Sequence, residues 1–126
     1  MPRGLTLDVG ALIALERGDW TIRSLLTQAR DRDVEISVPA GVVAQVWRGG
    51  ARQARVSRLL NSPPVGVVSL DEFTARAVGV LCDRSGHSDI VDVSLALNAA
   101  EMDHVVVTSD PKDIRSVIPD LHLIIV

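Results

Sequence analysis

Short aliphatic runs alternate with amphipathic stretches along the whole chain. The runs are rich in valine, isoleucine and leucine and predict buried strands, whereas apolar residues spaced three and four apart predict helices. Breakers such as Gly86 and the Asn61–Pro64 cluster separate these segments. The expected strands are 5–8, 35–38, 65–70, 105–108 and 121–126, and the expected helices are 10–15, 21–33, 40–48, 51–60, 72–84, 88–102 and 111–117.

The alternation of strands and helices predicts the fold class. It implies right-handed crossovers and a parallel sheet that carries helices on both faces. We therefore expect an α/β protein, a single-domain α/β/α sandwich around a central parallel sheet of about four to five strands, over residues 1–126. The hydrophobic pattern alone leaves the order of the strands open.

Composition narrows the functional classes. Hydrophobic residues make up 47% of the chain, but the aromatic residues are only Trp20, Trp47 and Phe73, which argues against a platform that stacks bases on several rings. Cys82 is the one cysteine, so an intrachain disulfide is excluded and a reducing compartment is favoured. No apolar run reaches the roughly 18 residues of a membrane span. We expect a cytoplasmic protein, and the net charge of −3 neither indicates nor excludes nucleic-acid binding.

Four aspartates are the candidate chemistry. Asp8 and Asp110 each follow a predicted strand, and the carboxyl ends of parallel strands form the usual ligand site of such sheets. Asp89 and Asp92 lie three residues apart at the start of a predicted helix, on one face. Carboxylate oxygens are the ligands that Mg²⁺ and Mn²⁺ prefer. The four aspartates therefore predict a site for a hard divalent cation.

Helix capping is the alternative for each of these aspartates. Asp8, Asp89 and Asp110 each precede a predicted helix, where aspartate is a preferred N-cap. Asp92 would also be favourable in a first helical turn through the helix dipole. However, Asp92 lies between two valines, and burying an unpaired charge is costly, so the functional interpretation is favoured there.

Two further groups of polar residues have simpler explanations. The three histidines lack the spacing of zinc ligands, and a lone histidine is usually structural. Four arginines recur every three or four residues and predict a basic stripe that is either a solvated helix face, a phosphate contact or a site for an acidic segment of a partner protein. The histidines are His87, His104 and His122, and the arginines are Arg48, Arg52, Arg55 and Arg58.

Three segments together resemble a known family. They are Leu7–Leu15, Gly86–Leu97 and Val107–Ile114, and each contains one or two of the candidate aspartates. With their order and spacing, the chain resembles the PIN-domain ribonucleases, specifically the VapC-type toxins of bacterial toxin–antitoxin modules. The likeness extends over essentially the whole chain.

This resemblance implies a function and roles for individual residues. It implies an Mg²⁺- or Mn²⁺-dependent endoribonuclease that acts on RNA, is restrained by a cognate antitoxin and forms a homodimer. Asp8, Asp92 and Asp110 would be the catalytic residues, and the same three with Asp89 would hold the metal. Asp113 would support them at the start of its helix.

The chain also departs from the family pattern. Gln45 stands where the family usually has a glutamate, and Val9 and Gly10 replace a common hydroxyl-bearing pair. These changes keep open a second hypothesis, a catalytically attenuated PIN-like module that binds a protein partner. A receiver-type phosphoryl-transfer domain is disfavoured because Asp8 has no neighbouring acid after the first strand.

Overall fold

A computed structural model describes residues 3–126, so Met1 and Pro2 of the predicted domain lie outside the described part. In chain order the elements are β1 (Gly4–Leu7), α1 (Val9–Glu16), α2 (Trp20–Asp31), β2 (Glu35–Pro39), α3 (Ala40–Val46), the 3-10 turn η1 (Ala51–Gln53), α4 (Ala54–Leu60), β3 (Val65–Val68), α5 (Glu72–Ser85), α6 (Ile90–Met102), β4 (His104–Thr108), α7 (Pro111–Val117) and β5 (Leu123–Ile125).

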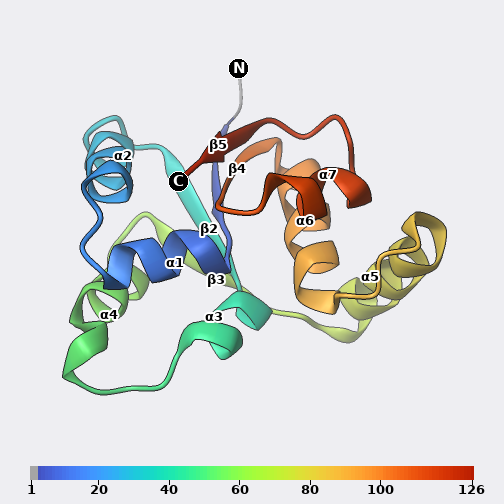
Figure 1. Cartoon of the computed structure of the whole chain (residues 1–126), viewed down its shortest axis with the longest axis horizontal. Coiled ribbons are helices and arrows are strands. Elements are labelled where there is room, and N and C mark those ends of the chain that lie inside the picture. Colours follow the sequence, from blue (N-terminus) through green and yellow to red (C-terminus); the bar gives the residue numbers. More distant parts are fainter. Residues whose placement is uncertain (1–2) are drawn as a thin grey trace.

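The five strands form one parallel sheet in the order β3-β2-β1-β4-β5. Helices α1, α2 and α4 lie on one side of the sheet, and α5, α6 and α7 lie on the other (Figure 1). The predicted α/β sandwich is therefore confirmed. The chain runs outward from β1 to β3 and then returns to β4, so the order reverses between β1 and β4, where parallel sheets bind ligands.

Burial explains why the aliphatic runs form strands. All four residues of β1 and all five of β4 are buried or half-buried, as expected for a parallel sheet that is covered on both faces. Leu7, Ile36 and Val107 have no or almost no exposed surface. No helix in residues 3–126 combines the length and the apolar character needed to cross a membrane.

Most predicted boundaries agree with the structure within two residues. One expected helix, 51–60, instead begins with η1 and continues as α4. The reason is local: Gly49 and Gly50 adopt positive φ, and the buried Gln53 side chain accepts hydrogen bonds from the N–H groups of Arg48 and Gly49 at 2.8 and 2.9 Å. The strands β3 and β5 are shorter than expected, ending at Val68 and Ile125.

A buried polar network joins α6 to the centre of the sheet. The Thr6 hydroxyl on β1 lies 2.9 Å from Nδ1 of His104 on β4 and accepts a 3.1 Å hydrogen bond from the Asn98 amide on α6. Burial lowers the pKa of His104, which favours its neutral form. The network fixes the position of α6, which carries Asp92, relative to β1, which leads into Asp8.

Candidate active site

Asp8 lies at the switch point of the sheet and caps α1. Its backbone N–H donates to the Val107 carbonyl at 3.1 Å, and its Oδ1 accepts from the Ala11 N–H at 2.8 Å. The residue is 7% exposed. Burial raises the pKa of Asp8, and hydrogen bonds from the Thr108 side chain and from backbone N–H groups oppose that increase. Asp8 is therefore both an N-cap and a buried carboxylate at the predicted ligand site.

Asp92 occupies the first turn of α6, which Asp89 caps. Oδ1 of Asp89 accepts from the N–H groups of Val91 and Asp92 at 2.9 and 3.1 Å. Burial raises the pKa of Asp92, the hydrogen bond from His87 lowers it, and the charges of Asp89 and Asp113 raise it further. The Asp92 carboxylate is therefore half-buried and lies among other negatively charged groups.

Asp110 and Asp113 extend this environment from α7. The hydrogen bond with Asp110 and the Asp110 charge raise the pKa of Asp113, and Asp89 contributes in the same direction. Asp110 is the N-cap residue of α7, yet its side chain makes no capping hydrogen bond. The charges of neighbouring aspartates thus act on Asp92 and on Asp113, and we call the group the acidic cluster: Asp89, Asp92, Asp110 and Asp113.

Asp8 differs from the acidic cluster in what determines its pKa. The main influences on the pKa of Asp8 are burial and hydrogen bonds, and no other carboxylate is among them. In residues 3–126, no three carboxylate, imidazole or thiol groups are arranged so that they could hold a metal ion. The structure thus places the four predicted aspartates at one edge of the sheet, with Asp89, Asp92 and Asp110 in the cluster and Asp8 beside β4.

His87 is a site residue that the sequence did not reveal. Its Nε2 lies 3.1 Å from Oδ2 of Asp92, and its Nδ1 lies 3.2 Å from the Ser116 hydroxyl. That hydroxyl donates to the Asp113 carbonyl at 2.6 Å, so it accepts from Nδ1. These two contacts fix the imidazole of His87 between Asp92 at the start of α6 and Ser116 on α7.

The fold explains how His87 reaches Asp92. Gly86 ends α5 in the left-handed conformation, with φ of 72°, and the chain turns there before α6 begins. The only sequence signal is the spacing of five residues between His87 and Asp92 across a glycine turn.

Gly10 is explained by the packing of α1 against the β4–α7 connection. A Cβ atom on residue 10 would overlap the Ser109 hydroxyl and lie 2.7 Å from Ser109 Cβ. The Ser109 N–H also bonds Asp8. Ser109 thus fills the space that a side chain at position 10 would occupy, next to the first predicted metal ligand.

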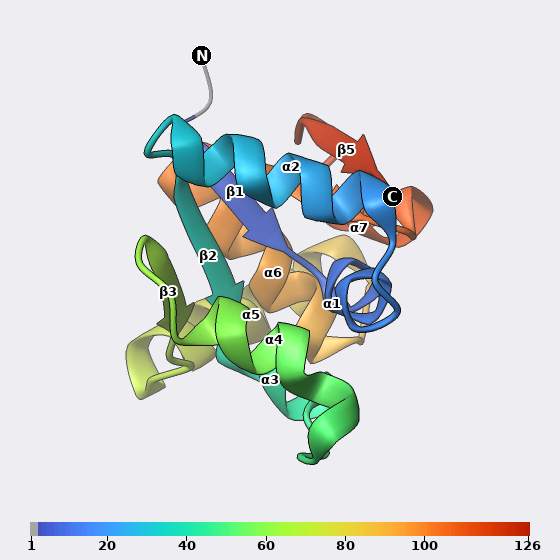
Figure 2. The ribbon, with the colours of Figure 1, turned by 90° about the vertical axis from the view of Figure 1, so that its left-hand side faces the viewer.

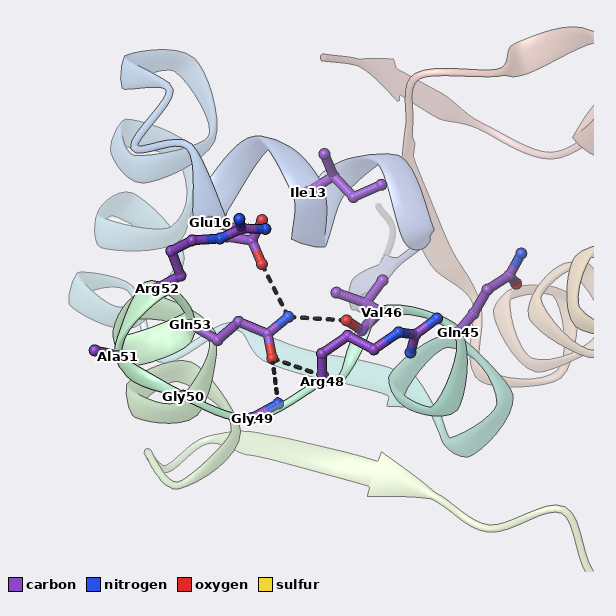
Figure 3. A pocket seen from close by; sticks show the side chains of 10 residues that line it. All are labelled: Ile13, Glu16, Gln45, Val46, Arg48, Gly49, Gly50, Ala51, Arg52 and Gln53. Atoms are coloured by element: carbon purple, nitrogen blue, oxygen red, sulfur yellow. Dashed lines mark hydrogen bonds between the residues drawn. The ribbon is translucent and has the colours of Figure 1, made fainter.

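Gln45 lies on α3 between α1 and α6. It is exposed and lines a cavity of about 500 Å³ with Ile13, Glu16, Val46 and the segment 48–53. Figure 3 shows its amide extending away from Glu16 and Gln53. Gln45 shares a helix face with Gly41, where an added Cβ would lie 3.4 Å from Val91. This face therefore approaches the first turn of α6, next to Asp92.

Gln53 organises the opposite wall of that cavity. Its amide donates to Glu16 Oε1 and to the Val46 carbonyl, each at 2.8 Å (Figure 3). With the two hydrogen bonds from Arg48 and Gly49, the side chain is fully satisfied. The Glu16 carboxylate is therefore fixed by Gln53 on the far side of the cavity from Gln45.

Comparison with solved structures places this arrangement in a known fold. The chain superposes on the VapBC2 structure from Rickettsia felis bound to a promoter DNA fragment with a TM-score of 0.70 and 17% identity, covering 97% of this chain and 98% of that one. FitAcB from Neisseria gonorrhoeae gives 0.63 and 18%, covering 94% and 95%, and FitAB bound to the IR36 DNA fragment gives 0.63 and 14%, covering 95% and 93%. The chain has a PIN-like fold. No protein-family model and no curated protein matches it.

The fold predicted from the three sequence segments is therefore confirmed, and VapBC2 is among the structural neighbours. At 14 to 18% identity the likeness is one of fold.

Burial of Asp8 makes a prediction about stability. Because the folded-state pKa of Asp8 lies above the ordinary value of 3.8, the folded protein binds this proton more tightly than the unfolded chain. The free energy of unfolding therefore falls as the pH rises from the ordinary pKa of aspartate through the higher pKa of Asp8 in the folded protein. Asparagine keeps the N-cap acceptor without the charge. With a chelator present, Asp8→Asn should raise the melting temperature near neutral pH by a few degrees, and the difference should shrink below pH 3.8.

Thermal unfolding followed by circular dichroism measures this difference. Asp120→Asn is the matched control, because Asp120 is exposed and no such pH-dependent gain is expected there. A lower melting temperature for Asp8→Asn than for the native chain near neutral pH would show that burial is not the dominant influence on Asp8.

Proposed function

We propose that this protein is a metal-dependent endoribonuclease and the toxin of a type II toxin–antitoxin module. The observation that carries the proposal is a buried carboxylate, Asp8, at the switch point of a PIN-like sheet, with an acidic cluster at the same edge. Catalytic carboxylates are typically found where burial or like charges raise their pKa values, as burial does for Asp8 and as burial and like charges do for Asp92.

The donor groups have the chemistry that Mg²⁺ or Mn²⁺ requires. Burial opposes ionisation of Asp8 and of Asp92, and the charges of Asp89 and Asp113 add to this effect at Asp92, so a bound cation would compensate the charge of each carboxylate. We propose Asp8 and Asp92 as the principal ligands, with Asp89 and Asp110 completing the set. When bound, the cation would lower the pKa of a coordinated water and polarise a phosphate.

The chain's own groups would assist in two ways. The backbone N–H groups around Asp8 fix its carboxylate, so little reorganisation is needed when a substrate arrives. His87 Nε2 lies 3.1 Å from Asp92 Oδ2, beside the proposed metal ligands. We propose that a protonated His87 would donate to a leaving oxygen there.

The partners follow from the same proposal. VapBC2 and FitAB were each solved bound to DNA. Their similarity in fold supports a cognate antitoxin as the protein partner of this chain. RNA as the substrate and a homodimer as the assembly are parts of the proposal that rest on the family resemblance.

A second candidate is a PIN-like module that binds a partner but cleaves RNA weakly or not at all. Gln45 favours this alternative, because an amide carries no charge to help hold a cation next to Asp92. The absence of three converged metal-binding groups among residues 3–126 points in the same direction.

Cleavage of RNA tests the first proposal. The native chain should cleave single-stranded RNA with added Mg²⁺ or Mn²⁺, and Asp8→Asn and Asp92→Asn should each lower the rate by about a hundredfold, since several kcal/mol of transition-state stabilisation are lost. Asp120→Asn, which changes an exposed aspartate, should retain the native rate. Equal rates for the native chain and both site variants, or no cleavage with ample metal, would refute the nuclease.

Substitution of Gln45 tests whether this position belongs to the proposed metal site. Gln45→Glu should tighten Mn²⁺ binding by about tenfold and raise the cleavage rate at limiting metal, because it adds a carboxylate near Asp92. Gln45→Ala is the control, since it removes the amide without adding charge and should not tighten binding. Unchanged metal affinity and unchanged rate in Gln45→Glu would show that this position lies outside the metal site.

A further inference from the structure

A groove of about 220 Å³ lies between α2 and α4, above the end of α1, and we call it the arginine groove. Figure 2 shows α2 and α4 on the same side of the sheet, the side on which α1 also lies. Four exposed arginines line the groove over a floor that includes Leu15 and Leu26; they are Arg23, Arg30, Arg55 and Arg58.

Helix geometry brings these arginines together from distant parts of the chain. Arg23 and Arg30 are seven residues apart on α2 and therefore share one face. Leu26, which is 3% exposed, anchors α2 between them. Arg55 and Arg58 are three residues apart on α4. The predicted stripe is thus divided: Arg55 and Arg58 join α2 arginines, whereas Arg48 and Arg52 line the cavity next to Gln45.

The positive charges of the groove are not neutralised within the described chain. The ion pairs in residues 3–126 involve Arg76, His87 and His104, so none of the four groove guanidinium groups is paired with a carboxylate there. Arg55 donates instead to the Glu16 carbonyl at 3.2 Å, and Gln53 holds the Glu16 carboxylate. Four unpaired arginines in a protein of net charge −3 indicate a binding site for an anion.

The position of the groove favours a nucleic-acid backbone as that anion. Leu15, in the groove, and Asp8, at the proposed catalytic edge, lie near opposite ends of α1, a helix of eight residues and thus about 12 Å long. A strand of a few nucleotides can therefore reach both. The arginine-lined cavity beside Gln45 adjoins the groove, since α1 residues Glu16 and Leu15 line the two in turn.

Electrostatics supply the reason for a separate binding surface. The acidic cluster repels phosphates, so a chain that acts on RNA needs attraction elsewhere, and arginine forks bind phosphate oxygens in pairs. We propose that the arginine groove binds the sugar-phosphate backbone of the single-stranded RNA substrate, outside the catalytic edge. This inference rests on the proposed action on RNA and adds the surface that holds the strand.

Binding of labelled single-stranded RNA tests the groove without any cleavage. Fluorescence anisotropy with the full chain in a chelator gives the affinity and its salt dependence. Arg23→Gln/Arg58→Gln should weaken binding about tenfold and make the slope of log K against log salt shallower by about 1.4, because each lost phosphate contact removes about 0.7. Glutamine retains good helix propensity, so both helices should persist.

Arg76→Gln/Arg84→Gln is the matched control, since it removes the same charge from exposed positions of α5 on the opposite side of the sheet. Equal RNA affinity in the groove and control variants would overturn the inference. So would a groove variant that keeps its RNA affinity but loses binding of poly-glutamate, because the groove would then be a site for an acidic peptide.

The two proposals fail in different ways. RNA binding that depends on the groove, together with no cleavage under any metal, would refute the nuclease and support the groove. Metal-dependent cleavage, with RNA affinity insensitive to the groove arginines, would refute the groove and support the nuclease.

Discussion

β1 and β4 lie next to each other in parallel register, with Leu7 opposite Val107, and the candidate site depends on this pairing. It places Asp8 beside Thr108 and directs both following segments, α1 and the β4–α7 connection, to one edge of the sheet. The buried network of Thr6, His104 and Asn98 then fixes α6 against the same two strands. A carboxylate is thereby held where water is scarce and its charge is costly.

That cost is the physical link between the fold and the proposed chemistry. Burial favours the protonated form of Asp8 over that of an exposed aspartate. For Asp92, the hydrogen bond from His87 offsets part of the cost of burying the carboxylate. Both arrangements leave the site short of positive charge, which a divalent cation would supply. The arginine groove provides positive charge at the other end of α1. One helix thus separates an acidic surface that would bind a cation from a basic surface that would bind an anion.

Local sequence signals were sufficient for the fold and for the positions of the aspartates. Strand ends and caps are encoded within a few residues, so Asp8 and Asp89 could be placed by pattern, and each serves as a cap as well as a candidate ligand. The role of His87 could not be predicted because it depends on how α6 and α7 pack. The arginine groove was missed for the same reason, since Arg23 meets Arg55 only when α2 packs beside α4.

The most direct test of the central claim, that Asp8 and Asp92 share one cation, is paramagnetic broadening of backbone amide signals by substoichiometric Mn²⁺. The account predicts the strongest broadening at residues 8–11, 89–93 and 108–110, weaker broadening of the signals of Arg23 and Arg30, and loss of the effect in Asp8→Asn. Broadening confined to the acidic cluster around Asp89 and Asp113, and unchanged by Asp8→Asn, would contradict it.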